Sequence, residues 1–354
     1  MKRLFATVVL ASMLLVLIPG CQTQSPEGAA NGGTPAADTK AEVSGTKTDT
    51  QKQAKSRKEL TIGVSMQTLG APYFVAQDNA LKKKCQELGI KCISIDAQGD
   101  VNKQIADIED LIAQKVDILI LNPKDPKGLI PATKACTKAG IPVIIMDNSI
   151  DPEADYVTMV QSNNMKNGEL VGEWLGEKMR GTPIKMALLS GNQGNMLGVD
   201  RREGVIRGLT EAQLRLDNRT SFTVVTQGWG NWTTEGGLKA SEDILVAAPE
   251  TNVIVAENDS MALGAVKAVA AAGKEEDILI CAAADGQKEA LELIKLGKYG
   301  ATGLNNPALV AATTLDIALK YLDSERNIPK LINTPAACIT KENVDEYYDP
   351  NSDF

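Results

Sequence analysis

The length, composition and charge of the chain exclude several classes of protein. At 354 residues it can hold two α/β domains plus export or linker segments, and its 43% hydrophobic and 23% charged residues are typical of a globular protein. The net charge of -8 argues against nucleic acid or an anionic membrane surface as the main partner, and the absence of histidine removes the commonest general base and zinc ligand.

Residues 1–21 resemble a bacterial lipoprotein signal. A short basic start precedes an uncharged apolar run over residues 4–18, which is too short to span a bilayer comfortably. The run ends in Leu17-Ile18-Pro19-Gly20-Cys21, although Pro19 stands where a small residue is more usual. We expect Cys21 to be lipidated and to anchor the protein on the extracytoplasmic side of the cell membrane. The alternative is an ordinary secretory signal with a chance cysteine.

Residues 22–58 are predicted to be a disordered tether. They contain one large aliphatic residue, Val43, among small and polar residues, so they cannot bury enough apolar surface to offset the entropy lost on ordering.

Five cysteines follow Cys21, with neither an even count nor a C-x-x-C spacing. Each is expected to be a free thiol among apolar residues, and a bridge between Cys85 and Cys92 is left open.

From Leu60 onward, short β-rich runs alternate with helical segments. Strands are expected at residues 60–64, 92–95, 118–121 and 143–146, and helices at 74–88, 105–113 and 131–139. The helical prediction for 105–113 rests on Ile105, Ile108 and Ile112, which share one face. This alternation is typical of βαβ units in a parallel sheet.

The pattern then restarts. Helices are expected at 168–178, 202–214, 234–246 and 261–272, and strands at 185–189, 221–226, 253–256 and 278–282. Two successive α/β runs of similar build predict two similar lobes, and the continuous apolar run of residues 118–121 predicts a strand buried on both faces.

Ligands of such sheets bind beyond the carboxyl ends of the strands, where polar and aromatic side chains recur in this chain. Carboxylate and amide groups can each hydrogen-bond two adjacent hydroxyls, and aromatic faces stack on sugar rings. The candidates are Tyr73, Phe74, Asp147, Asn148, Asn258, Asp285 and Asn305, whereas Asp259 is expected to be a helix cap.

The loop Gly228-Trp229-Gly230-Asn231-Trp232 contains two tryptophans, whose apolar rings are expected to cover a ligand or part of the protein surface. One of the two indoles is predicted to contact the ligand, and the other is left as a possible anchor of the interdomain face.

At these positions the chain resembles the periplasmic sugar-binding proteins of the ribose and galactose type, over residues 59–345. The resemblance is specific because several segments occur together in order, namely Gly70-Ala71-Pro72-Tyr73-Phe74, Leu121-Asn122-Pro123, 141–147, 256–265 and Ala283-Ala284-Asp285-Gly286.

The resemblance implies a set of ligand-binding residues: Gln67, Tyr73, Phe74, Asp147, Asn148, Trp232, Asn258, Asp285 and Asn305. The family asparagine of the first loop is Ala71 here. Asn148 replaces one family arginine, and the second arginine falls near Val199, with Arg201 and Arg202 close by. Losing two guanidiniums puts ribose itself in doubt and leaves a pyranose, a polyol or another neutral ligand open.

The family fold has two doubly wound parallel-sheet lobes joined by a three-segment hinge. We place the first lobe at 59–163 plus 306–334 and the second at 164–305 plus 335–354. The expected hinge residues are Ser162, Asn163, Asn305, Asn306 and Pro335.

The implied function is that of a monomeric binding protein that delivers a sugar or polyol to the permease of an ABC importer, with no cofactor, metal or catalytic residue. A sensor that presents the ligand to a membrane receptor stays open. A sugar-processing enzyme that uses Asp147 and Asp285 as an acid and base pair is a weaker alternative.

Overall fold

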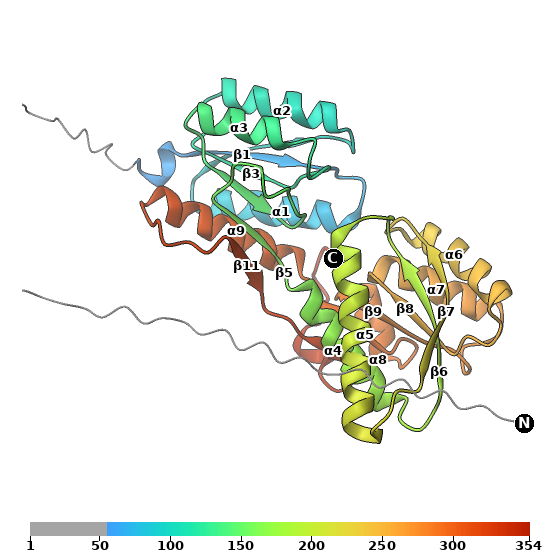
Figure 1. Cartoon of the computed structure of the whole chain (residues 1–354). Coiled ribbons are helices and arrows are strands. Elements are labelled where there is room, and N and C mark those ends of the chain that lie inside the picture. The colour runs from blue at the N-terminus through green and yellow to red at the C-terminus, as the bar shows by residue number, and fades with distance from the viewer. Residues whose placement is uncertain (1–54) are drawn as a thin grey trace, which may run out of the picture. The chain divides into compact units, whose positions relative to one another are not determined.

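The structure, a computed structural model, describes residues 55–354; Cys21, the export signal and tether residues 22–54 lie outside the described residues. The first of two six-stranded sheets has the order β11-β5-β4-β3-β1-β2, and all of its neighbouring strands are parallel (Figure 1). Its strands are β1 (Thr61–Met66), β2 (Lys91–Asp96), β3 (Ile118–Leu121), β4 (Val143–Met146), β5 (Thr158–Ser162) and β11 (Leu331–Thr334).

The second sheet repeats this plan with the order β12-β10-β9-β8-β6-β7. Only its edge strand β12 is antiparallel to its neighbour. The strands are β6 (Ile184–Ser190), β7 (Phe222–Trp229), β8 (Val253–Ala256), β9 (Leu279–Asp285), β10 (Ala301–Leu304) and β12 (Cys338–Thr340).

Helices cover both faces of each sheet, so the predicted doubly wound α/β class is confirmed (Figure 1). Strand β3 shows the cause, because Ile118 and Ile120 enter one core and Leu119 and Leu121 the other. The first sheet packs α1 (Pro72–Glu87) and α9 (Pro307–Leu322) on one face and α2 (Val101–Ala113) and α3 (Ile130–Lys138) on the other. The second packs α4 (Asn164–Lys178) and α5 (Met196–Asp217) opposite α6 (Thr234–Ala247), α7 (Asp259–Ala271) and α8 (Lys288–Lys295).

Helices α4 and α5 approach each other very closely because glycines line their contact. A Cβ atom added to Gly172 would lie 2.2 Å from the Val205 carbonyl oxygen, and one added to Gly208 would lie 1.9 Å from the Glu169 carbonyl oxygen. No side chain fits there. The approach matters for function because α5 carries Arg201, which this packing brings against α4.

The chain passes between the two sheets after Ser162, at Asn305–Asn306 and at 335–337, which are the segments for which hinges were predicted. The fully buried side chain of Asn167 joins all three. Its amide nitrogen donates to Ser162 Oγ (2.9 Å) and to the Leu304 carbonyl oxygen, and its amide oxygen accepts from the Ala337 backbone N–H (3.2 Å).

Some boundaries differ from the predictions. Residues 55–58 were assigned to the tether, but Arg57–Glu59 form a 3-10 helix (η1) that Ser56 caps, and Lys55 pairs with Asp117 at 2.7 Å. Helix α5 begins six residues before its predicted start because the Asn195 side chain caps it by accepting from the Gly198 N–H. All five cysteines of the described region are free, including Cys85 and Cys92.

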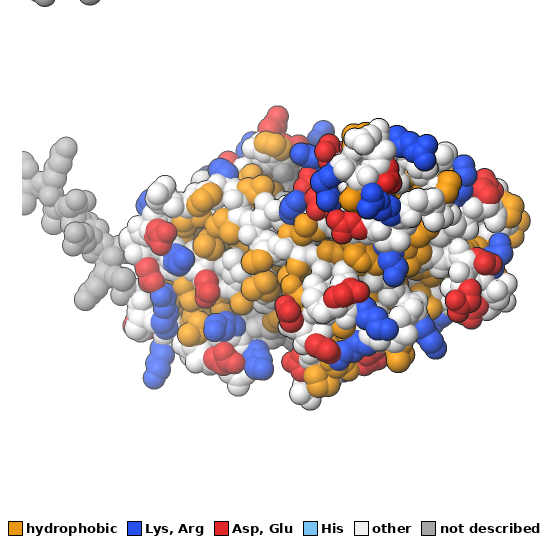
Figure 2. Space-filling view, turned by 90° about the horizontal axis from the view of Figure 1, so that it is seen from below, with side chains coloured by type: hydrophobic (Ala, Val, Ile, Leu, Met, Phe, Trp, Pro, Cys, Tyr) orange, Lys and Arg blue, Asp and Glu red, His pale blue; other side chains and the backbone are white. Residues whose placement is uncertain are grey.

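Charged side chains of both signs are interspersed with apolar ones on the face that Figure 2 shows, so that face carries no continuous field of one sign. Among the described residues, no helix is both long and apolar enough to cross a bilayer.

Candidate functional site

A cleft of about 550 Å³ lies at the carboxyl ends of the strands of both sheets. Its walls come from the loops that follow β1, β3 and β4 in the first lobe and β6 to β10 in the second. All nine residues expected to bind a ligand line this single cleft: Gln67, Tyr73, Phe74, Asp147, Asn148, Trp232, Asn258, Asp285 and Asn305. The topology explains this convergence, because parallel strands end at the same edge of their sheet.

The wall on the first lobe centres on Tyr73 and Asp147. Pro72 occupies the first position of α1, where its missing N–H costs nothing, and it directs Tyr73 into the cleft. The Tyr73 hydroxyl lies 2.9 Å from Asp147 Oδ1 and 2.8 Å from Asn305 Oδ1. Asp147 has a positive φ of 68°, a sparsely populated conformation that persists only where the surroundings hold it, and such strain clusters at binding sites.

A buried ion pair forms the wall on the second lobe. Arg201 Nη2 lies 3.3 Å from Asp285 Oδ1, and Asn305 donates its amide N–H to the same carboxylate at 2.8 Å. The remaining guanidinium nitrogens of Arg201 are also used: Nε donates to Asn164 Oδ1 (2.8 Å) and Nη1 to the Glu257 carbonyl oxygen (2.9 Å). Tyr73 and Asn305 thus link the two aspartates into one polar network, which Arg201 joins through Asp285.

Burial raises the pKa values of both aspartates in this network. It raises the pKa of Asp285 to about 6, although the nearby Arg201 guanidinium lowers that pKa. Burial also raises the pKa of Asp147, against the lowering effect of the Tyr73 hydrogen bond. Both carboxyls therefore gain from donors that hydrogen-bond their ionised form, which is what the hydroxyls of a ligand provide.

Trp232 is the indole that lines the cleft. It follows β7, and both Asn231 and Trp232 have positive φ angles, of 50° and 64°. The ring lies directly against Gly191, where an added Cβ would be 2.0 Å from Trp232 Cε2. Trp229, expected in the same loop, is instead the last residue of β7, and the cleft lining does not include it.

The helix-cap role expected of Asp259 is wrong, whereas Asn258 lines the cleft in which it was expected. Asn258, not Asp259, caps α7, since its side-chain oxygen accepts from the Met261 N–H at 3.0 Å. Asp259 is fully buried and accepts from the Gly286 and Gln287 N–H groups at 2.7 and 2.8 Å. It therefore shapes the loop after Asp285, which the sequence pattern did not reveal because Asp259 lies 27 and 28 positions from these two residues.

The other candidates also have protein partners. The Gln67 amide lies 3.5 Å from Asn122 Oδ1, and Asn148 donates to the Pro123 carbonyl oxygen at 3.3 Å. Phe74 packs against the first-lobe core and also lines the cleft.

The prediction that the binding site lacks an arginine was wrong. The sequence comparison placed Val199, not an arginine, at the second family arginine position, so no guanidinium was expected in the cleft. The structure instead brings Arg201 to the cleft and leaves Val199 out of the lining. The Gly- and Asn-rich loop of residues 191–195 follows β6 and was also missed, although its position after a strand was a usable signal.

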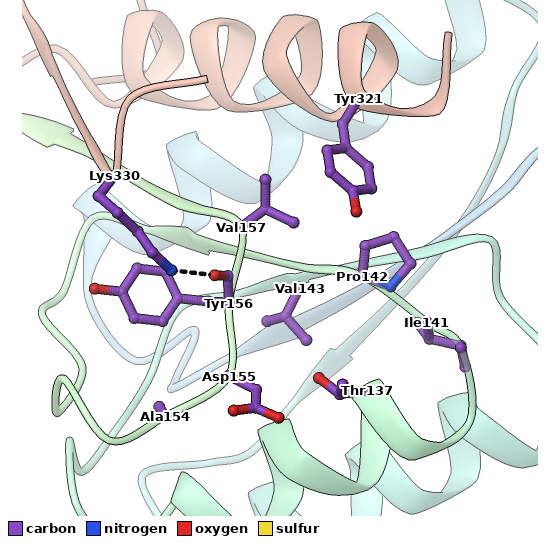
Figure 3. Close-up of a pocket in the computed structure, with 11 residues that line it drawn as sticks. Thr137, Ile141, Pro142, Val143, Ala154, Asp155, Tyr156, Val157, Tyr321 and Lys330 are labelled. Atoms are coloured by element: carbon purple, nitrogen blue, oxygen red, sulfur yellow. Dashed lines mark hydrogen bonds between the residues drawn. The ribbon is translucent and has the colours of Figure 1, made fainter. Parts of the chain in front are cut away.

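A second hollow, of about 540 Å³, lies in the first lobe between α9 and the start of β4 (Figure 3). Tyr321 and Pro142 face it, and Lys330 bonds the Tyr156 carbonyl oxygen and lies 3.9 Å from the centre of the Tyr156 ring. It contains none of the predicted site residues and sits at the amino ends of the strands. The cleft is therefore the better candidate. Within residues 55–354, no cluster of three potential metal ligands occurs.

Comparison with known proteins adds four findings. Residues 62–326 match the family described as periplasmic binding protein domain. The chain is 33% identical over 287 residues to the ribose import binding protein RbsB of Bacillus subtilis (strain 168), covering 81% of this chain and 89% of that protein.

Among solved structures, it resembles an ABC transporter periplasmic solute binding protein of Actinobacillus succinogenes with bound D-allose (29% identity, TM-score 0.75, 82% of this chain and 100% of that chain). It also resembles a Caulobacter myo-inositol binding protein bound to myo-inositol (29% identity, TM-score 0.73, 81% and 94%).

Proposed function

The chain belongs to the periplasmic binding protein domain family, and on this premise we propose that it is an extracytoplasmic solute-binding protein that captures a small neutral sugar or polyol and delivers it to the permease of an ABC importer. The observation that carries the proposal is the convergence of two buried aspartates, six asparagines and three aromatic side chains on one cleft between the lobes. Such a lining suits a ligand with apolar ring faces and hydroxyl edges.

In the proposed mechanism, ligand hydroxyls donate to Asp147 and Asp285, and Trp232 and Phe74 stack on the faces of the ring. Closure about Ser162–Asn163, Asn305–Asn306 and Pro335 then brings both walls onto the ligand. The ligand shifts the population toward the closed form by its higher affinity for that form. In this proposal the protein acts as a monomer, and the polar groups of the cleft bind the ligand without catalysing a reaction.

The test is calorimetric titration with D-ribose, D-allose and myo-inositol. At least one should bind, and chromatography should recover it unchanged. Asp147→Ala should weaken that binding about tenfold or more, because a hydrogen bond to a charged group contributes roughly 1.5–3 kcal/mol. As a control, Asp323→Ala alters a carboxylate of α9's C-cap outside the cleft and should bind like the parent. Turnover of the sugar, or equal binding by Asp147→Ala, contradicts the proposal.

We also propose that a lipid on Cys21 anchors the protein to the cell membrane. The support is the apolar run that ends in Gly20-Cys21. Mass spectrometry of membrane-extracted protein should find Cys21 as an acylated N-terminus, and Cys21→Ser should release the protein from the membrane fraction. A different, unmodified N-terminus would show that the segment is an ordinary secretory signal.

A further inference from the structure

The end of the chain, residues 347–354, is anchored on the second lobe. Tyr347 and Tyr348 pack against the core under α6 to α8, and the Tyr348 hydroxyl donates to Glu292 Oε1 at 3.1 Å. Further along, Lys288 Nζ donates to the Pro350 carbonyl oxygen at 2.6 Å. Lys288 begins α8, just after the cleft residue Asp285, so the segment runs toward the mouth of the cleft.

The segment then turns and reaches the first lobe. The turn is held by the Ser352 N–H, which donates to the Asp349 carbonyl oxygen (3.1 Å), and by the Phe354 N–H, which donates to Ser352 Oγ (3.2 Å). The Phe354 ring meets Tyr73 edge to face, with centroids 5.5 Å apart and planes at 85°. Figure 1 marks this end of the chain between the two sheets.

We infer that residues 347–354 form a clasp that favours the closed arrangement of the lobes and positions Tyr73 in the binding site. The inference rests on the proposed function. The three covalent crossings persist whether the lobes are open or closed, whereas the contact between Phe354 and Tyr73 must break when the lobes separate. A contact present in one state alone shifts the population toward that state.

Phe354 acts through Tyr73, since the cleft lining includes Tyr73 but not Phe354. The Tyr73 ring is held edge to face by Phe354 and also by Phe74, at 5.5 Å and 89°. These two contacts set the ring's orientation, and hence the hydroxyl that bridges Asp147 and Asn305. Phe354 is therefore a positioning residue, supplied by the second lobe to a ligand-facing side chain of the first.

The test uses the mature protein and Phe354→Ala. Edge-to-face pairs contribute enough to predict roughly two- to tenfold faster release, followed by tryptophan fluorescence, of whichever of D-ribose, D-allose and myo-inositol binds the parent. Phe354→Tyr keeps the ring and should restore slow release. As a control, Leu296→Ala removes a 66% exposed side chain of the same lobe and should leave release unchanged.

A second measurement needs no ligand: small-angle scattering should show a larger radius of gyration for unliganded Phe354→Ala than for the parent. Unchanged release together with an unchanged radius overturns the clasp. Tighter binding by Phe354→Ala also overturns it, because the segment would then obstruct the cleft. If the parent binds none of the three sugars, the proposed function fails, and the scattering comparison still decides whether the clasp holds the lobes together.

Discussion

Replacing Arg201 with alanine should lower the free energy of unfolding by about 3–5 kcal/mol and bring ligand binding below detection. The side chain is 6% exposed and pairs with Asp285, so its removal leaves a buried carboxylate without its cation. The substitution also leaves Asn164 Oδ1 and the Glu257 carbonyl oxygen without the hydrogen bonds that Arg201 donates to them. Urea denaturation gives the stability, and calorimetry with the bound sugar gives the affinity.

Arg207→Ala is the matched control for this experiment. Arg207 lies two turns further along α5, its side chain is 68% exposed, and it pairs with Glu169 at 3.1 Å. An exposed pair of this kind contributes about 0–1 kcal/mol. The double variant Arg201→Met, Asp285→Asn should regain much of the lost stability because it leaves no unpaired charge, yet it should still not bind. A loss for Arg201→Ala no larger than that for Arg207→Ala would contradict the role given to this ion pair.

Gly208→Ala should destabilise the protein by about 3 kcal/mol, although alanine is favoured over glycine inside a helix by about 1 kcal/mol. The new Cβ would lie 1.9 Å from the Glu169 carbonyl oxygen, and backbone atoms on both helices cannot yield without moving α5 away from α4. Because α5 carries Arg201 and α4 carries Asn164, affinity should fall together with stability. Urea denaturation measures the loss of stability, provided that the m-value of the variant equals that of the parent.

Replacing an alanine with glycine at an exposed helix position separates the steric effect at Gly208 from the effect of helix propensity. Ala135 is exposed in the middle of α3, so Ala135→Gly should cost about 1 kcal/mol from propensity alone. If Gly208→Ala instead stabilises the protein, the close approach of α4 and α5 does not constrain position 208.

The sequence by itself determined the α/β class and the site's location. Continuous apolar runs mark β3, β4 and β8 because their side chains enter cores on both faces of the sheet. The strand-end rule then placed Asp147 and Asp285 at one cleft, since it depends only on strand direction. Strands β5, β10, β11 and β12 were not predicted, because polar or small residues interrupt each of them and no continuous apolar run marks them.

Only the tertiary structure decided which side chains share the network and which are turned away. Arg201, rather than the aligned Val199, enters the cleft because helical rotation and the glycine contact between α4 and α5 set the direction of each side chain. Asn167 joins three segments, one of which lies 170 positions from it along the chain, and Phe354 reaches Tyr73 from the other lobe. Local patterns carry no signal for such contacts, because these pairings depend on how distant elements pack.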